Sequence, residues 1–207
     1  LDCDLVVCKD LKSLWETDVN DMAVAMAPDY NYNNEETLGR LGGHVSNYLN
    51  SGVIVMNLDY WRKYDIQNKV LTYILDNRDR IIYPDQDALN VILKDARMEL
   101  PIIYNVAPYL FYKNIENIPG DRYAEIKEAR ESPVIFHYMG PTKPWSLGNY
   151  IQGNELFLKY QGLSGWRHVV IQKHFFKRLV YTLFPFYRKK AWEDKTYVDG
   201  WEKYYKE

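Results

Sequence analysis

The sequence predicts an α/β fold, because short apolar segments typical of buried strands alternate with segments of helical periodicity. The apolar segments are 1–8 (LDCDLVVC), 53–58 (VIVMNL) and 134–138 (VIFHY). Between the last two, apolar residues from 66 to 74 recur on one helical face. Strands that alternate with helices in this way are typical of α/β domains.

The elements of the first half follow from local composition. Residues 9–18 predict a short surface helix or turn, and the Asn- and Gly-rich residues 30–43 predict a long loop that could cover a site. Ser51 and Gly52 introduce the strand 53–58, and glycine there lets the backbone approach another group closely. A helix is expected over 65–78.

The second half begins with another helix, over 83–96. Pro84 favours extended geometry at Tyr83, and Asp85 is placed as the N-cap of this helix. We then expect a strand or extended segment over 98–106 and a short polar helix over 120–133. The strand 134–138 follows, and after it comes a turn-rich loop.

Composition restricts the class of protein. The chain has 207 residues, of which 47% are hydrophobic and 15% aromatic, which excludes a disordered chain. No stretch reaches the roughly 18 apolar residues that a spanning helix needs, and no signal peptide is recognisable. The expected setting is therefore cytoplasmic. Cys3 and Cys8 are expected to be reduced, buried thiols on opposite faces of a strand.

Charge divides the chain into two regions. Residues 156–192 contain eight Lys and Arg and no Asp or Glu, which gives this region a charge of +8. Because the whole chain has a net charge of −2, the remaining residues together carry −10. We expect a catalytic domain over 1–150 and a helical, basic and aromatic extension over 151–207. Within it, residues 166–190 are interpreted as a peripheral anchor on an anionic membrane surface. A packed helix with solvated cations is the alternative; no nucleic-acid motif accompanies the charge.

Two acids at the start of the chain suggest a metal site. In a strand, Asp2 and Asp4 would point to the same face while Cys3 faces away. Two close carboxylates repel each other unless a cation or hydrogen-bond donors hold them. His137 ends a predicted strand, and two carboxylates with one imidazole form a ligand set that suits Mn²⁺. The plain alternatives are surface acids and a hydrogen-bonded core histidine.

The segment HYMGPTKPW adds groups suited to phosphate. Gly140 permits close backbone approach, and Lys143 supplies a point charge. With LDCDLVV, LNSGVIVMNLDYWR and PDQDALN, in this order, the segment resembles the signature blocks of family 8 glycosyltransferases, a retaining group that includes bacterial lipopolysaccharide galactosyl- and glucosyltransferases. The resemblance covers residues 1–145. It implies a GT-A fold, which is a mixed sheet flanked by helices.

The resemblance also implies roles for individual residues. Asp2, Asp4 and His137 would hold Mn²⁺, with Mg²⁺ as a substitute, against the diphosphate of a UDP-hexose. The implied donor-binding residues are Asp2, Cys3, Asp4, Asn50, Ser51, Asp85, Gln86, His137, Gly140 and Lys143. The implied acceptor is a hydroxyl of a glycan or lipid-linked saccharide, at the inner face of the cell membrane.

The implied reaction retains the configuration of the sugar. Gln86 occupies the position of a nucleophile, but an amide is a poor one. We therefore favour front-face attack by the acceptor, with Gln86 and Asp85 steadying the cationic sugar. Two other functions stay open: a haloacid-dehalogenase-like phosphatase with Asp2 as nucleophile in D-x-D-x-[TV], completed by Asp4 and Val6, and a catalytically silent glycan- or membrane-binding protein.

The position of the acids also bears on the extent of the chain. In the resembled family, a nucleotide-binding half precedes the D-x-D strand. We therefore expect these residues to be the C-terminal portion of a longer protein, because a sheet beginning at this strand would expose an edge.

Overall fold

The computed structural model describes residues 1–43, 45–111, 120–145 and 151–166. The strands are β1 (Leu5–Val7), β2 (Val24–Pro28), β3 (Leu49–Met56), β4 (Arg97–Glu99) and β5 (Ile135–His137). The α-helices are α1 (Lys12–Trp15), α2 (Glu35–Arg40), α3 (Leu58–Lys63), α4 (Ile66–Asp76), α5 (Pro84–Ile92), α6 (Tyr123–Glu131) and α7 (Asn154–Leu163). Short 3₁₀ turns are η1 (Ile102–Tyr104), η2 (Pro108–Phe111) and η3 (Gly120–Arg122).

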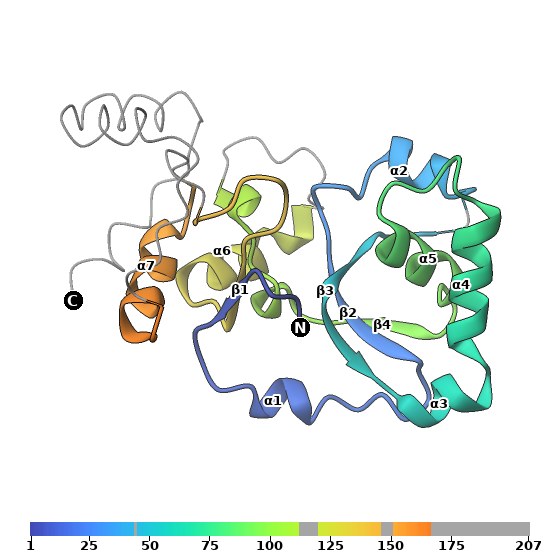
Figure 1. Ribbon diagram of the computed structural model, residues 1–207, viewed down its shortest axis with the longest axis horizontal. Coiled ribbons are helices and arrows are strands. Elements are labelled where there is room, and N and C mark those ends of the chain that lie inside the picture. The colour runs from blue at the N-terminus through green and yellow to red at the C-terminus, as the bar shows by residue number, and fades with distance from the viewer. Residues whose placement is uncertain (44, 112–119, 146–150, 167–207) are drawn as a thin grey trace.

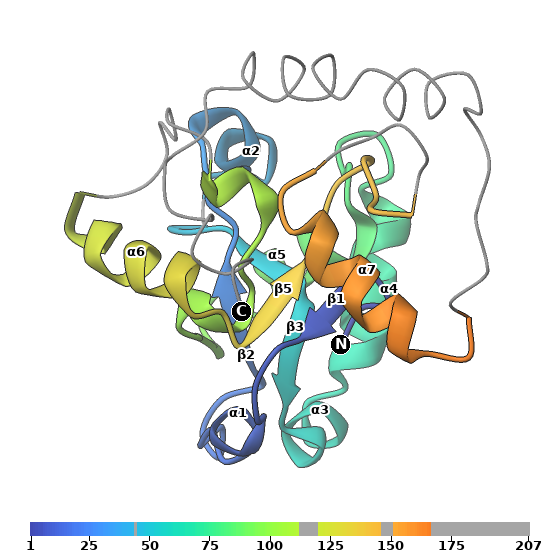
Figure 2. The same cartoon turned by 90° about the vertical axis from the view of Figure 1, so that its left-hand side faces the viewer.

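The described strands form two small sheets. In the first, β2 lies between an antiparallel β3 and a parallel β4, so the sheet is mixed. In the second, β1 and β5 run antiparallel with Leu5 opposite His137 (Figure 2). Val106 adds a parallel bridge to Phe136 of β5. The predicted α/β class is confirmed.

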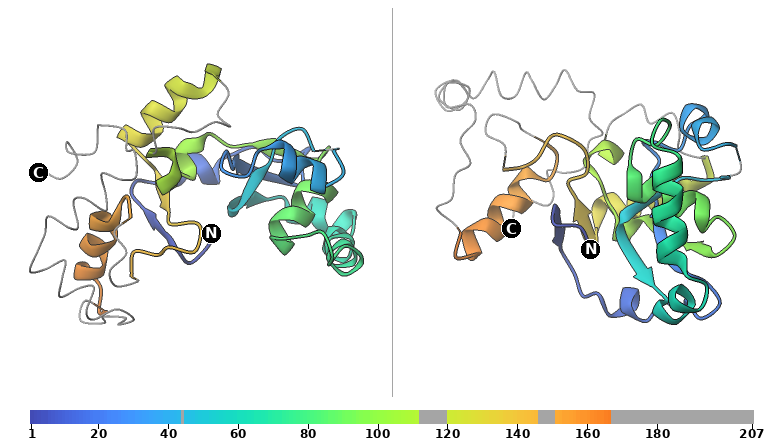
Figure 3. Two further views of the ribbon diagram at one scale, coloured as in Figure 1. Left: turned by 90° about the horizontal axis from the view of Figure 1, so that it is seen from above. Right: turned by 45° about the vertical axis from the view of Figure 1, so that its right-hand side comes forward.

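Strand β2 is buried on both faces and separates two parts of the core. Val24 and Met26 pack with residues of α4 and α5, which lie on one side of the mixed sheet in Figure 1. Ala25 and Ala27 pack on the other side, toward Ile135 of β5. The view from above shows the same division, with the β1–β5 pair, α6 and α7 on the far side of β2 from α4 (Figure 3).

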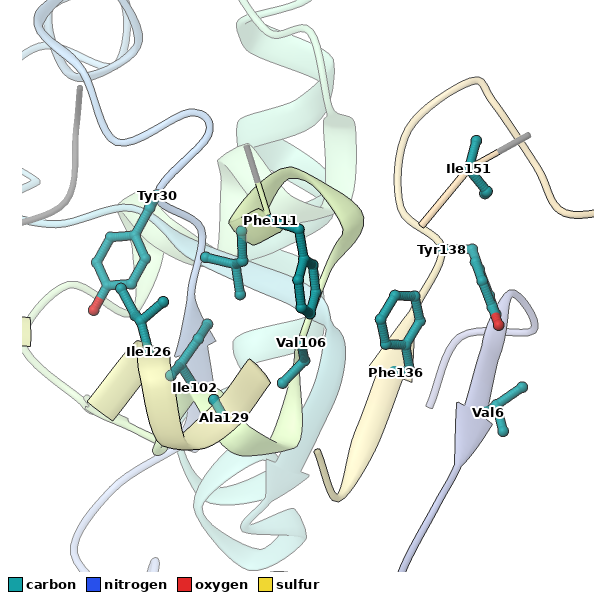
Figure 4. Close-up of a cluster of buried hydrophobic side chains, with 11 residues drawn as sticks. Val6, Tyr30, Ile102, Val106, Phe111, Ile126, Ala129, Phe136, Tyr138 and Ile151 are labelled. Atoms are coloured by element: carbon teal, nitrogen blue, oxygen red, sulfur yellow. The ribbon is translucent and has the colours of Figure 1, made fainter. Parts of the chain in front are cut away.

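A third cluster of buried apolar side chains packs around Phe136 of β5. The rings of Phe136 and Tyr138 lie 4.9 Å apart, and Phe111 stacks on Phe136 with a centroid distance of 6.2 Å. Residues of α6 and η1 complete this cluster (Figure 4). Because the strand that ends in His137 is anchored in packed aromatic side chains, the position of this histidine is well defined.

Several local predictions were wrong. The predicted loop 30–43 contains α2, whose N-cap Asn34 accepts a hydrogen bond from Thr37 N at 2.9 Å. Helix α5 begins with Pro84 in its first turn and Tyr83 as N-cap, so Asp85 is not the cap. Strand β1 begins only at Leu5, and Cys3 is exposed rather than buried.

The predicted basic extension is described only in part. Helix α7 packs on the body, where Phe157 meets Tyr138 edge-on at 6.2 Å. Residues 167–207 lie outside the described part of the chain, so of the proposed anchor 166–190 only Trp166 is described. The division at 150/151 stays a prediction. In the described part of the chain, every helix is too short or too polar to cross a membrane.

Candidate functional site

Asp2, Asp4 and His137 come together where β1 meets β5. One ligand atom from each lies within 4.8 Å of the other two. His137 Nε2 is 3.1 Å from Asp4 Oδ1 and 3.7 Å from Asp2 Oδ2. Asp2 and Asp4 precede β1 rather than lie in it, so strand alternation does not explain their pairing. The register does, because it sets Leu5 opposite His137 and thereby brings Asp4 beside the imidazole.

The backbone of this segment is tied to both sheets. Asp2 N donates to Gly52 O of β3 at 2.8 Å, and Tyr138 N, just past β5, donates to Asp4 O at 2.8 Å. The two acids are thus held between β3 and β5, which lie far apart in sequence, since β3 ends at Met56 and β5 begins at Ile135. This arrangement gives the cluster a fixed frame.

Lys143 is the cation of the cluster. Its Nζ donates to Asp4 Oδ2 and to Tyr138 O, the latter at 2.8 Å. Burial of the Asp4 carboxyl opposes its ionisation, but the contacts with His137 and Lys143 outweigh burial and hold the pKa of Asp4 well below its usual range. Gly140 has φ +88°, which glycine adopts without strain and which turns the loop after β5.

A second group of predicted residues meets around the side chain of Gln86, which is 7% exposed. Gln86 Oε1 accepts from Asn50 Nδ2 at 2.9 Å and from Ser51 N at 3.1 Å. Ser51 Oγ donates to the exposed Asp85 at 2.8 Å. Since a backbone N–H can only donate, Ser51 N fixes which end of the Gln86 amide is the oxygen. The amide orientation is therefore determined.

Asp29 is a buried carboxylate that sequence reasoning missed. It follows β2 directly, and its Oδ2 accepts from Gln86 Nε2 at 3.1 Å and from Asn50 Nδ2 at 3.4 Å. Burial raises the pKa of Asp29 to about 6, although these hydrogen bonds act in the opposite direction. An acid at the carboxyl end of a strand would have been a signal, had the strand been recognised.

Asn50 and Gly52 join the two groups. Asn50 Oδ1 accepts from Gly52 N at 2.9 Å while its Nδ2 donates to Gln86. A Cβ atom at Gly52 would lie 2.2 Å from Cε1 of His137. The expectation that glycine permits close approach here is confirmed, and the group that approaches is the imidazole of His137.

The N-terminal end of α5 is anchored by a buried ion pair behind Gln86. Asp87 is fully buried and receives a two-pronged contact from Arg40 of α2, at 2.7 and 3.2 Å. Ile82 N and Tyr48 Oη also donate to it. Burial opposes the ionisation of Asp87, but Arg40 and Tyr48 outweigh it and hold the pKa of Asp87 below its usual value. The ion pair fixes where the helix that carries Gln86 starts.

The residues present fit a divalent cation. Two carboxylates and one imidazole nitrogen converge, a mixed O/N set suited to Mn²⁺ or Mg²⁺. When the imidazole of His137 is neutral and its proton is on Nδ1, Nε2 carries a lone pair. This lone pair repels the carboxylate oxygens of Asp2 and Asp4 unless a cation binds to all three groups. Of the predicted donor-binding residues, the cluster includes Asp2, Asp4, His137 and Lys143, and the Gln86 network includes Asn50, Ser51 and Asp85. Cys3, which stands between the two acids in the sequence, has an exposed side chain.

Known proteins share this sequence and fold. The chain is 30% identical over 174 residues to general stress protein A of Bacillus subtilis, covering 82% of this chain and 59% of that protein. It is 31% identical over 147 residues to lipopolysaccharide 1,2-glucosyltransferase of Escherichia coli, covering 70% and 43%. The chain thus spans about half the length of these relatives.

A solved structure of galactosyltransferase LgtC with donor and acceptor sugar analogues superimposes with a TM-score of 0.67. Sequence identity is 28%, covering 78% of this chain and 59% of LgtC. This likeness confirms the GT-A fold that the resemblance implied. The model of glycosyl transferase family 8 matches residues 1–147, a span that holds both the carboxylate–imidazole cluster and the Gln86 network. On this match, the chain belongs to glycosyl transferase family 8.

Proposed function

We propose that the protein is a retaining hexosyltransferase that moves galactose or glucose from a UDP-sugar to a hydroxyl of a glycan or lipid-linked saccharide. The observation that carries this proposal is the cluster of Asp2, Asp4 and His137 beside the buried network of Gln86. The proteins that this chain resembles add support. One is named a lipopolysaccharide glucosyltransferase, and LgtC was solved with donor and acceptor sugar analogues.

In this proposal the cluster receives the diphosphate of the donor. Asp2, Asp4 and His137 would hold Mn²⁺, which when bound acts as a Lewis acid toward the leaving diphosphate. Lys143 adds a cation that can turn from Asp4 to a phosphate oxygen. Gly140 shapes the loop that brings Lys143 back to the cluster.

The network of Gln86 would then face the transferred sugar. Its Oε1 already accepts from Asn50 and Ser51, which draws electron density away from the oxygen and makes it a weaker nucleophile. This supports front-face attack by the acceptor, with the dipole of Gln86 and the charge of Asp85 stabilising the oxocarbenium-like sugar. A glycosyl adduct trapped on Gln86 or Asp85 during turnover would contradict this mechanism.

The decisive assay is slow hydrolysis of a panel of UDP-sugars, which needs no acceptor. We expect UDP release that depends on Mn²⁺ and that falls at least about a hundredfold in His137→Ala. A protein that binds sugar but releases no UDP would be the silent binding protein. Phosphate release from p-nitrophenyl phosphate with Mg²⁺, and none of UDP, would instead support the phosphatase.

We also propose that residues 166–190 bind the anionic inner surface of the cell membrane. The support is the excess of cations in this part of the sequence and the exposed side chain of Trp166. Sedimentation with anionic vesicles should pull down the full chain but not a chain ending at Gln161. Equal binding by both chains would contradict this anchor, and neutral vesicles serve as the control for charge.

A further inference from the structure

The imidazole of His137 is held from the side opposite to the two acids. Its Nδ1 lies 2.8 Å from Asn105 Oδ1, and Asn105 and His137 are 1% and 2% exposed. A carbonyl oxygen only accepts, so Nδ1 carries the proton in this contact. In the neutral ring the remaining nitrogen, Nε2, is then unprotonated. It lies 3.1 Å from Asp4 Oδ1, so its lone pair points to where a metal ion shared with the acids would bind.

The backbone keeps Asn105 in this place. Asn105 N donates to Ile102 O at 2.9 Å, and the next residue, Val106, exchanges hydrogen bonds with both neighbours of Phe136 on β5. Asn105 is therefore fixed to the strand that ends in His137. The Cα of Gly52 closes another side of the ring, leaving no room for a side chain there.

We infer that Asn105 is a positioning residue that sets the tautomer and the ring orientation of His137 for metal binding. The inference rests on the proposed function, because it treats His137 as a metal ligand. Partners of this kind orient the ligands of metal sites, and their loss typically weakens metal binding by about 10- to 100-fold. Without Asn105, Asp4 is the acceptor that remains for a ring N–H, and a proton on Nε2 would block the metal.

The first test is Mn²⁺ titration of the full chain, followed through the electron paramagnetic resonance signal of free Mn²⁺. Asn105→Leu keeps the volume but removes the acceptor, so its affinity should fall by about 10- to 100-fold. Asn105→Asp keeps an acceptor oxygen and should restore affinity to within about threefold of wild type. Asn57→Leu also loses side-chain hydrogen bonds, but beyond the far end of β3, and should bind as wild type does.

The second test reads the tautomer in the wild-type protein without metal. Long-range ¹H–¹⁵N spectra of histidine-labelled protein at alkaline pH should show a protonated Nδ1 and a bare Nε2 for His137. A protonated Nε2 would overturn the inference, because Asn105 would then offer its nitrogen rather than its oxygen. This measurement decides the matter even where Asn105→Leu does not fold.

The outcomes separate the inference from the function on which it rests. If wild type binds Mn²⁺ and Asn105→Leu binds it equally, the positioning role is refuted and the proposed function stands. If wild type binds no Mn²⁺ at all, both are refuted.

Discussion

Gly52 offers a sharp test of the site, because its substitution by alanine acts through space alone. The added Cβ would lie 2.2 Å from Cε1 and 2.8 Å from Nδ1 of His137. Carbon atoms in contact are about 3.5–4.0 Å apart, so the ring or the strand must move by about 1 Å or more. His137 is buried, with Nδ1 2.8 Å from Asn105 Oδ1 and Nε2 3.1 Å from Asp4 Oδ1, so the ring cannot move without losing these contacts.

The expected cost has two parts. Overpacking of this kind destabilises by about 1–3 kcal/mol, which corresponds to a fall in melting temperature of about 2–12 °C for a chain of this size. The displaced imidazole should also weaken Mn²⁺ binding by about 10- to 100-fold. Thermal unfolding with and without Mn²⁺, together with Mn²⁺ titration, measures both parts.

Gly39 provides the matched control for this substitution. It is exposed in α2, and a Cβ there would meet nothing within 4 Å. Alanine at Gly39 should leave Mn²⁺ affinity unchanged and stabilise the helix by up to about 1 kcal/mol. If Gly52→Ala matches this control in both affinity and melting temperature, the described packing of His137 on Gly52 is wrong.

Two further predictions concern the buried acids behind the site. Because burial raises the folded-state pKa of Asp29 from 3.8 to about 6, the folded protein binds more protons than the unfolded one between these values, and the free energy of unfolding should fall as pH rises through that window. Denaturant titrations should show Asp29→Asn abolishing up to about 3 kcal/mol of this pH dependence; an unchanged profile would show that Asp29 is not its source. Arg40→Met leaves Asp87 buried without its cation and should cost about 3 kcal/mol or more, whereas Lys94→Met, which removes an exposed ion pair, should cost less than about 1 kcal/mol. Equal losses of stability in these two variants would contradict a structural role for the Arg40–Asp87 pair.

The sequence predicted the elements with a strong local pattern. Helices α4 and α5 and strand β5 were expected within a few residues of their bounds, because their apolar spacing or their proline is a local signal. Strand β2 was missed although it is central to the mixed sheet. Its residues, VAMAP, alternate no polar positions, contain two alanines and end in proline, which are weak signals for a strand. Only burial on both faces by α5 and β5 accounts for it.

The residues of the candidate site also fall into those that the sequence predicted and those that it did not. Asp2, Asp4 and His137 could be predicted because their residue types and order are themselves the signal. Asp29 and Asn105 could not, because each gains its meaning from a partner far along the chain: Gln86 is 57 residues from Asp29, and His137 is 32 from Asn105. A lone Asp or Asn after an apolar run is common, so only the fold distinguishes these two.

The contacts of Asn50 bear on how the two halves of the site work together. One amide accepts from the backbone of Gly52, on which His137 packs, and donates to the oxygen of Gln86. A shift of the imidazole therefore reaches the amide that would face the sugar through a single side chain. Because Gln86 is also held by Asp29 and by the backbone of Ser51, it has little freedom to rotate toward a covalent bond. A rigid dipole of this kind is suited to stabilising the positive charge that develops on the sugar in the transition state, rather than to acting as a nucleophile toward the sugar carbon.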